Sequence, residues 1–271
     1  MSADAQSDTR PDIPQPDIPQ PDIPQPDVQR HIRSRPGDVA PYVLIPGDPG
    51  RAERIAAKFA SATLVAKHRE YVIYTGTTAA GTPVSVCSTG IGGPSASIAV
   101  EELTRIGATH FIRVGSSGGR QPDMPIGSVV VATAAYRGEG TSHDYIPAPF
   151  PAVADLSVSN ALIAAAQGLG HPPYTGIVYT RDAFYRRDKS LNQLLTDAGV
   201  VAAEQECATV FVVGSLLKVK VGAILGTDSN IWLEQQPLPA EKERLYREVE
   251  ATIIDISLIA VDKLHAAQEV P

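Results

Sequence analysis

Two arginines, Arg51 and Arg113, each belong to a glycine-rich turn that follows a run of apolar residues. The two segments read Tyr-Val-Leu-Ile-Pro-Gly-Asp-Pro-Gly-Arg over 42–51 and Phe-Ile-Arg-Val-Gly-Ser-Ser-Gly-Gly over 111–119. Glycine lets backbone N–H groups turn toward a ligand, a following helix adds its positive N-terminal end, and a guanidinium offers two donors spaced for an oxyanion. The two turns therefore predict a pocket for a small anion.

The elements that must position these arginines follow from the pattern of the chain. Short β-branched runs alternate with longer helical stretches, which is typical of an α/β domain, here a single domain with a central mixed sheet flanked by helices. We expect strands at 42–46, 71–78, 83–88, 109–114, 127–133, 174–180 and 220–226, and helices at 50–60, 94–106, 157–169, 189–198, 204–217 and 239–266. Ligands of such sheets bind outside the carboxyl ends of the strands, where Arg51 and Arg113 both fall.

Composition narrows the class of partner. The net charge of −7 argues against a nucleic-acid surface, because phosphate backbones are held by many basic side chains. Cys87 and Cys207 stand in apolar stretches without metal-type spacing, so we expect buried free thiols. No apolar run approaches the ~18 residues of a membrane span, and the N-terminus does not resemble a signal peptide. We expect a cytoplasmic protein that does not contact membranes.

The N-terminal segment repeats Pro-Asp-Ile-Pro-Gln three times over residues 11–25. Proline removes backbone donors and isolated isoleucines cannot build a core. We therefore expect residues 1–30 to form a disordered or polyproline-like tail, and residues 31–271 to form the folded domain.

Two further patterns invite a functional interpretation that their spacing does not support. The turn around Gly90 fails the dinucleotide-binding spacing at Ser95. Glu204 and Glu206 are two residues apart at a predicted helix start, so they do not share a helix face and are not interpreted as an acid/base pair. A carboxylate at Glu204 is favourable near a helix N-terminus.

From about residue 31 to residue 230, the chain resembles the nucleoside phosphorylase family, which includes uridine phosphorylases and hexameric purine nucleoside phosphorylases. The motifs that carry the resemblance are Gly47-Asp-Pro-Gly-Arg51, His68-Arg-Glu70, Ser88-Thr-Gly-Ile-Gly-Gly-Pro-Ser95 with Ala99-Val-Glu-Glu-Leu103, Arg113-Val-Gly-Ser116, Phe150-Pro-Ala-Val-Ala-Asp155, Asp182-Ala-Phe-Tyr185 and Glu204-Gln-Glu-Cys-Ala-Thr209. The resemblance implies a nucleoside phosphorylase domain over 31–271 and a reaction that cleaves a nucleoside with inorganic phosphate as co-substrate.

The resemblance also implies roles for single residues. Phosphate would be held by Gly47, Arg51, Arg113 and Ser116, with Arg69 supplied by a neighbouring subunit. The nucleoside would contact His31, Phe184, Gln205 and Glu206. Among these residues, Glu206 would bind the ribose 2′ and 3′ hydroxyls, and His31 would reach the 5′ hydroxyl from the neighbour.

Other implications concern assembly and ions. The resemblance implies a homo-oligomer, a hexamer built from dimers, that needs no organic cofactor. It further implies a monovalent cation, K⁺, bound by Glu70, the Ile91 carbonyl and Ser95 at a subunit interface.

The identity of the base stays open between two hypotheses. The stretches 88–103 and 150–155 look most like uridine phosphorylases, which places phosphorolysis of uridine to uracil and ribose 1-phosphate first. Purine nucleosides or methylthioadenosine are the alternative, because an Asp of the purine enzymes protonates the leaving base and Asp228 is the candidate general acid. Aligned without a gap, Ser229 falls on that position instead.

Two hypotheses outside phosphorolysis are weaker. A nucleosidase would use water, which needs no clamp of arginines, so Arg51, Arg69 and Arg113 argue against it. A module that binds nucleoside or phosphate without catalysis would not account for the presence of both Glu206 and Phe184, so these two residues argue against it.

Overall fold

The structure is a computed structural model that describes residues 27–268 of the chain. The repeats of the predicted tail lie outside the described residues. Residues 27–30 are described, and there Gln29 N donates to the Ser34 carbonyl at 2.8 Å. No helix in the described part of the chain is both long and apolar enough to cross a membrane.

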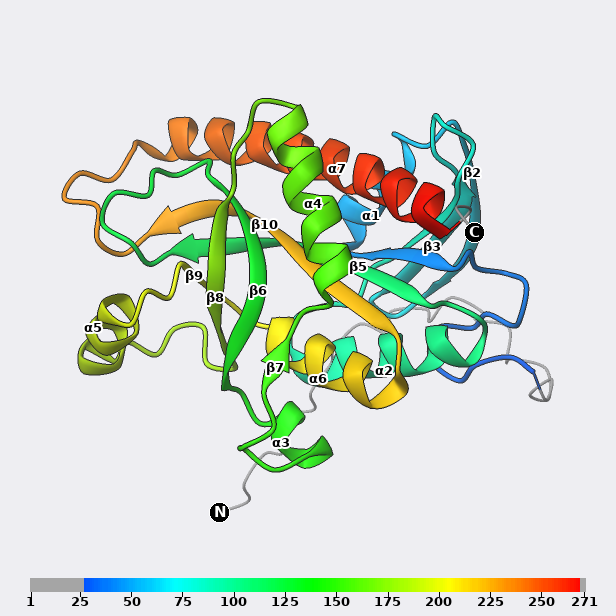
Figure 1. The fold of residues 1–271 in the computed structure, drawn as a ribbon, viewed down its shortest axis with the longest axis horizontal. Coiled ribbons are helices and arrows are strands. Elements are labelled where there is room, and N and C mark those ends of the chain that lie inside the picture. The colour runs from blue at the N-terminus through cyan, green and yellow to red at the C-terminus, as the bar shows by residue number, and fades with distance from the viewer. Residues whose placement is uncertain (1–26, 269–271) are drawn as a thin grey trace, which may run out of the picture.

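A single mixed sheet organises the described residues (Figure 1). Its strands are, in spatial order, β10 (Lys220–Asn230), β6 (Val129–Gly138), β8 (Tyr174–Arg181), β9 (Ala202–Glu204), β5 (His110–Gly119), β1 (Tyr42–Ile45), β4 (Pro83–Cys87), β3 (Tyr71–Thr77) and β2 (Ser61–His68), with β7 (Ala152–Val153) on β6. β10 also pairs in parallel with β5, so β5, β10, β6, β8 and β9 form a closed ring of pairings. The predicted α/β fold with a mixed sheet is confirmed.

Helices cover both faces of this sheet. They are α1 (Pro49–Ala56), α2 (Gly93–Arg105), α3 (Thr141–Tyr145), α4 (Leu156–Gly168), α5 (Lys189–Asp197), α6 (Cys207–Leu217) and α7 (Pro239–Gln268). α1, α4 and α7 supply one apolar core, and α2 and α6 supply the other. Successive side chains of a strand point to opposite faces of the sheet, so neighbouring residues enter different cores. Phe111 of β5 packs in the core that α2 and α6 cover, and Ile112 packs in the core that α1, α4 and α7 cover.

The prediction that a helix spans 204–217 is wrong at its start, because residues 202–204 form β9 and α6 begins at Cys207. β5, β6 and β10 extend beyond their predicted ends. β2, β7, β9 and α3 were not predicted. β7 and β9 have only two and three residues, and the first four residues of β2 are exposed, so none of these strands shows a strong apolar pattern.

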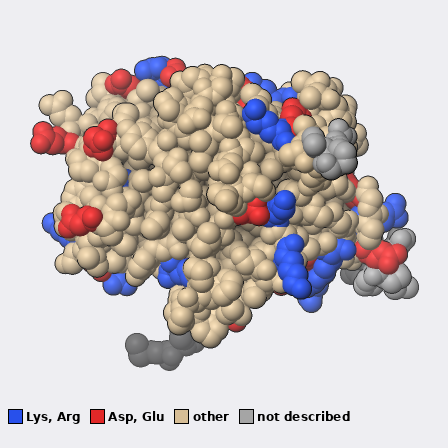
Figure 2. All heavy atoms as spheres, viewed as in Figure 1, with Lys and Arg blue, Asp and Glu red and all other residues tan. Residues whose placement is uncertain are grey.

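Figure 2 shows the face of the molecule that carries β6, β8 and α4. A broad area with few charged side chains extends across this face, interrupted right of centre by neighbouring acidic and basic side chains, and the other charged side chains lie mostly around its border. Large apolar side chains on these elements and on β7 are exposed, namely Tyr136, Val153, Leu156 and Ile177. An apolar surface of this kind is typical of a contact between protein molecules.

Candidate functional site

A cavity of ≈ 960 Å³, the central cavity, opens where several strands end. Its walls come from the loops after β1, β4 and β8, the last residues of β5 and β10, and the junction between β9 and α6. Nine residues predicted from the sequence line it: Gly47, Arg51, Arg113, Ser116, Phe184, Gln205, Glu206, Asp228 and Ile91. Predicted residues from separate parts of the chain therefore meet in one place, as expected for the carboxyl ends of parallel strands.

The turn before α1 explains why Gly47 and Arg51 are fixed there. A Cβ on Gly47 would lie 2.9 Å from the carbonyl oxygen of Gly90, so only glycine fits where the two turns touch. Asp48 caps α1 by accepting hydrogen bonds from the backbone N–H groups of Gly50 and Arg51. The Arg51 side chain therefore projects from the first turn of α1, at the edge of the central cavity.

The Arg51 side chain is buried and anchored by groups far away in the sequence. Its Nε donates to Glu250 Oε2 at 3.0 Å, and its Nη1 donates to the Val114 carbonyl at 3.0 Å. Its Nη2 contacts the hydroxyl of Tyr246. Glu250 and Tyr246 both come from α7, so the C-terminal helix holds one of the two predicted anion-binding arginines in position.

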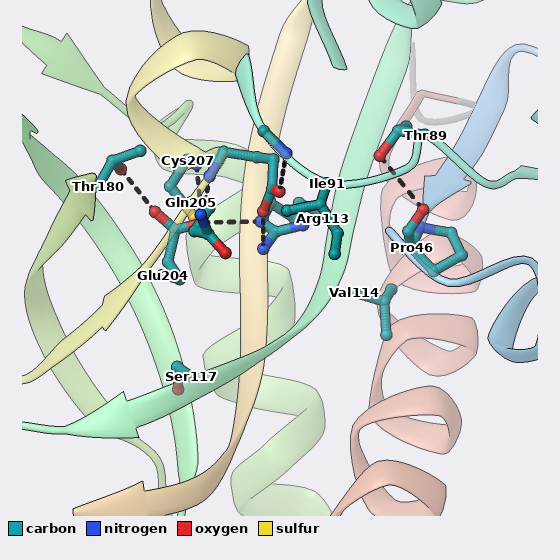
Figure 3. Close-up of polar contacts among 12 residues, drawn as sticks. Pro46, Thr89, Ile91, Arg113, Val114, Ser117, Thr180, Glu204, Gln205 and Cys207 are labelled. Atoms are coloured by element: carbon teal, nitrogen blue, oxygen red, sulfur yellow. Dashed lines mark hydrogen bonds and ion pairs between the residues drawn. The ribbon is translucent and has the colours of Figure 1, made fainter. Parts of the chain in front are cut away.

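Arg113 lies between two buried carboxylates. Its Nε donates to Glu204 Oε2 at 3.0 Å, and its Nη2 forms an ion pair with Glu206. Glu204 is fixed in turn, since it accepts hydrogen bonds from Thr180 Oγ1 at 2.5 Å and from the backbone N–H of Cys207 at 2.9 Å (Figure 3). Glu204 therefore orients Arg113 and also caps α6, which agrees with the predicted preference for a carboxylate at this helix start.

Glu206 combines burial with an excess of negative charge. Its Oε1 accepts a hydrogen bond from the backbone N–H of Gly92, at the start of α2. Burial raises the pKa of Glu206, and the neighbouring charge of Glu204 raises it further, whereas Arg113 acts in the opposite direction. Glu204 and Glu206 both pair with the single guanidinium of Arg113. The negative charge of ionised Glu206 is therefore only partly compensated.

The structure explains why both Asp228 and Ser229 are candidates for the position of the general acid. The pairing of β10 with β5 shifts register between Thr227 and Ser229, which leaves Asp228 as the extra residue of a β-bulge. Both side chains line the central cavity, and Ser229 Oγ donates to Asp228 Oδ1 at 2.6 Å. The Ser229 hydroxyl and the Asp228 carboxylate are thus hydrogen-bonded neighbours on the cavity wall.

The remaining predicted nucleoside contacts differ in how firmly they are held. Phe184 follows β8 and is 54% exposed, so its ring is free to cover a ligand. Gln205 donates through Nε2 to the Asp182 carbonyl at 3.0 Å, which fixes its amide beside Glu206.

Two of the residues predicted to bind phosphate or nucleoside, His31 and Arg69, do not line the central cavity of their own chain. His31 forms a 2.6 Å contact through Nδ1 with Glu102 Oε1, and its carbonyl lies 2.8 Å from Nδ1 of His68. Arg69 occupies the turn between β2 and β3 with a φ of 55°, a left-handed conformation. Both positions agree with the expectation that these side chains serve another subunit, which stays a prediction.

The three residues predicted to hold a cation lie close together. Ser95 Oγ is 3.4 Å from the Ile91 carbonyl, and a Cβ placed on Gly90 would be 3.0 Å from Glu70 Cγ and 3.3 Å from Ser95 Oγ. One carboxylate with neutral oxygen atoms suits a hard cation. Among residues 27–268, no group of three or more His, Cys, Asp and Glu side chains suits a transition metal.

Several residues of the site were missed by sequence reasoning. Tyr246 and Glu250 lie in a long amphipathic helix whose pattern gives no functional signal. Arg120, Arg181 and Arg187 also line the cavity. Arg120 directly follows the glycine-rich run that contains Arg113, and this position in the sequence could have indicated that Arg120 belongs to the site.

Comparisons with known proteins agree with this geometry. The family model described as the phosphorylase superfamily matches residues 41–261. The chain is 47% identical to a uridine phosphorylase of Treponema pallidum, over 72% of this chain and 80% of that protein. It is 42% identical to a guanosine phosphorylase of Halorubrum lacusprofundi, over 75% of this chain and 84% of that protein. The crystal structure of a uridine phosphorylase from Vibrio fischeri superposes with a TM-score of 0.83 at 34% identity, covering 89% of this chain and 100% of that chain.

Proposed function

This chain belongs to the phosphorylase superfamily, and we propose that it is a pentosyltransferase that catalyses the reversible phosphorolysis of uridine to uracil and ribose 1-phosphate in nucleoside salvage. The observation that carries the proposal is the meeting of Arg51, Arg113 and Glu206 in one cavity, in a chain that is 47% identical to a uridine phosphorylase. The first two side chains suit an oxyanion, and the third suits a polyol.

Phosphate binds in this proposal between the turn at Gly47 and the end of β5. Gly47, Arg51, Arg113 and Ser116 of the same chain hold it, and Arg69 of a neighbouring subunit completes the clamp. Because Arg51 and Arg113 are already fixed by carboxylates, little reorganisation is needed when the anion arrives. Inorganic phosphate is the co-substrate, and no organic cofactor takes part.

Cleavage of the N-glycosidic bond builds positive charge on the sugar ring, as in the transition states of glycoside cleavage. The phosphate held below the ring compensates that charge and then forms the new bond to the anomeric carbon. Glu206 accepts the ribose 2′ and 3′ hydroxyls, Phe184 and Gln205 border the nucleoside, and His31 of the neighbour reaches the 5′ hydroxyl. Positioning and electrostatics supply the acceleration, so the phosphate needs no proton transfer from these groups.

A second candidate substrate class is the purine nucleosides, methylthioadenosine included. Two observations favour it: Asp228 stands on the cavity wall, and the guanosine phosphorylase of Halorubrum lacusprofundi is 42% identical to this chain. In that case Asp228 protonates the leaving base as a general acid. The three arginines proposed for phosphate argue against hydrolysis by water, and against a module that only binds nucleosides.

The proposal includes a homohexamer built from dimers, since His31 and Arg69 lie outside their own cavity. The exposed apolar side chains of β6, β7, β8 and α4 support an interface between copies. Glu70, the Ile91 carbonyl and Ser95 fit a K⁺ ion, which would neutralise the carboxylate. Cys87 and Cys207 are free thiols, in keeping with a cytoplasmic enzyme.

The test is a panel of nucleosides with and without phosphate, in which release of free base is followed. Uridine, thymidine, inosine, adenosine and methylthioadenosine distinguish the candidate substrates. We expect release of uracil from uridine only when phosphate is present, with ribose 1-phosphate as the second product. Equal release in both conditions would show hydrolysis and reject the proposal.

A further inference from the structure

The segment that carries His31 is held against α2 by one buried carboxylate. Glu102 of α2 is 5% exposed, and its Oε2 accepts hydrogen bonds from the backbone N–H groups of His31 and Ile32, both at 2.9 Å. Its Oε1 lies 2.6 Å from Nδ1 of the His31 ring. Three nitrogen atoms of two consecutive residues thus meet the two oxygens of one side chain, which fixes both the backbone and the ring of His31.

Further contacts hold the same segment in place. Nδ1 of His68, the last residue of β2, lies 2.8 Å from the His31 carbonyl oxygen. The side chain of Ile32 is fully buried in the core that α2 and α6 cover. The side chain of His31, in contrast, is 27% exposed. The backbone is therefore anchored while the ring stays accessible to a ligand.

Glu102 holds His31 away from the central cavity of its own chain. The start of α2 borders that cavity, since the backbone N–H of Gly92 donates to Glu206. Glu102 follows Gly92 by ten residues, which corresponds to about 15 Å along a helix. A ring held beside Glu102 is therefore suited to a ligand bound to another copy of the chain, in agreement with the proposed contact between His31 and the neighbour's 5′ hydroxyl.

The contact at Nδ1 decides what the opposite ring nitrogen can do. An ionised carboxylate only accepts hydrogen bonds, so a neutral imidazole beside it carries its proton on Nδ1. Nε2 then has no proton and acts as an acceptor. The group that Nε2 binds must donate a hydrogen bond, which a hydroxyl does and an ether or thioether does not.

We propose that Glu102 is a positioning residue, which holds His31 in the tautomer whose Nε2 accepts a hydrogen bond and thereby makes the neighbour's site selective for a free 5′ hydroxyl. The inference rests on the proposed function for the role of His31. It narrows the candidate substrates to nucleosides with an unmodified 5′ end, uridine included, and disfavours a 5′ thioether such as methylthioadenosine.

Glu102→Gln is designed to exchange the tautomer. The amide oxygen can replace Oε2 and keep the two backbone N–H groups, which leaves the amide N–H groups facing Nδ1 of His31. Nδ1 then accepts a hydrogen bond, the ring proton moves to Nε2, and Nε2 becomes a donor. The variant should therefore tolerate an ether at the 5′ position, because an ether oxygen accepts hydrogen bonds.

The experiment compares uridine with 5′-O-methyluridine as substrates of the full chain in the presence of phosphate, at pH 8, where free imidazole is neutral. The parent chain should prefer uridine in kcat/KM by about tenfold or more, and Glu102→Gln should lower this preference by about tenfold. A role of Glu102 in folding alone would slow both substrates equally. An unchanged ratio of the two kcat/KM values would therefore overturn the proposal, as would a parent chain without the preference.

Two further variants assign the effect to His31. Glu101→Gln is the matched control, because Glu101 precedes Glu102 on α2 but pairs with Arg105 at 2.8 Å, and it should keep the parental ratio. His31→Gln replaces the ring by an amide, which can donate or accept. This variant should lose the preference for uridine, and it gives a result even where Glu102→Gln fails to fold. A parental ratio in His31→Gln would overturn the assignment.

A mixture of two variants shows which site Glu102 serves. Chains carrying Glu102→Gln and chains carrying Glu206→Gln are unfolded and refolded together. In a hybrid dimer, the active site has an intact Glu206 and receives His31 from the chain whose Glu102 is intact. About half of the active sites in the mixture should therefore regain the parental preference. If Glu102 acted within its own chain, every active site would keep the preference of Glu102→Gln.

The same measurements separate failure of this inference from failure of the proposed function. A parent chain that releases no uracil in the presence of phosphate rejects the proposed function, and the ratio is then measured on the nucleoside that the chain does cleave and its 5′-O-methyl derivative. A parent chain that releases uracil, with an equal ratio in Glu102→Gln, rejects the inference alone.

Discussion

Arg113 Nε donates to Glu204 Oε2 at 3.0 Å in a region where both side chains are buried. The carboxylate is itself held by Thr180 and by backbone N–H groups at the start of α6. The guanidinium is therefore oriented before phosphate arrives. Fixed donors of this kind stabilise a transition state without the cost of reorganising at the moment of reaction.

Glu204→Gln tests this orientation. The amide keeps the shape of the side chain but removes the charge that fixes Arg113, so kcat/KM for phosphate should fall by about tenfold or more. Steady-state kinetics with varied phosphate at saturating uridine gives the value. Glu101→Gln is the control, since it removes a carboxylate that pairs with Arg105 at 2.8 Å on α2. Equal losses in the two variants would contradict the special role of Glu204.

Glu206→Gln should separate activity from stability. Loss of the carboxylate that receives the ribose hydroxyls should lower kcat/KM for uridine by about 10² or more. Because burial raises the pKa of Glu206, its ionised form costs the folded state free energy at neutral pH. We expect the melting temperature at pH 7 to be equal to or above that of the parent chain. A marked drop would indicate that Glu206 is needed for folding.

The same pKa shift fixes the sign of a pH dependence. A carboxyl group whose folded pKa is raised binds more protons when folded, so its contribution to stability falls as pH rises from about 4.3, the usual value for Glu, through the folded pKa. The advantage of Glu206→Gln should therefore grow over that window and stay constant above it. Melting temperatures from pH 4 to pH 8 provide the check.

Glu250→Gln should behave in the opposite way. Although burial raises the pKa of Glu250, hydrogen bonds from Arg54 and Arg51 lower it below its usual value. Its contribution to stability is thus present above about pH 4.3 and is lost as pH falls through the folded pKa. The variant should lose about 3 kcal/mol at pH 7, as fits a broken buried ion pair, and the deficit should shrink in acid. A deficit independent of pH would show that packing, not charge, matters at this position.

Local patterns predicted the parts of the site that lie within single turns of the chain. Arg51 and Arg113 were recognisable because each stands beside glycine at a strand end, and the sheet then brings strand ends together. Glu250 and Tyr246 were not recognisable, because they meet Arg51 only after 199 and 195 residues of chain have folded. Long-range ion pairs leave no periodic trace in a sequence.

The same distinction applies to the fold. Long buried strands such as β5 and β10 were predicted, but their ends were not, since the pairing between them continues through glycine and serine residues with little strand preference. The bulge at Asp228 was also invisible, because a one-residue insertion relative to a partner strand is defined by the pairing and not by the strand itself.

The bulge leads to a prediction about the base. Asp228→Asn keeps the hydrogen bond from Ser229 Oγ but removes the acid. If Asp228 protonates a purine as it leaves, turnover of inosine should fall by about 10² or more while uridine is little affected. Ser229→Ala serves as the comparison, since it removes the hydroxyl and keeps the acid. Indifference of every substrate to Asp228→Asn would remove the general-acid role.

A mixture of two inactive variants tests whether the site is shared between subunits. Arg69→Met disables the residue proposed to come from the neighbour, and Glu206→Gln disables one within the cavity. In a hybrid dimer, one site combines an intact Glu206 with an intact Arg69 from the partner, and the other site carries both changes. Unfolding and refolding an equal mixture should therefore restore about one quarter of the sites, because half of the dimers are hybrids and half of their sites are complete. Each variant refolded alone supplies the baseline. If Arg69 acted within its own chain, no hybrid site would be complete, and the mixture would stay as inactive as its components.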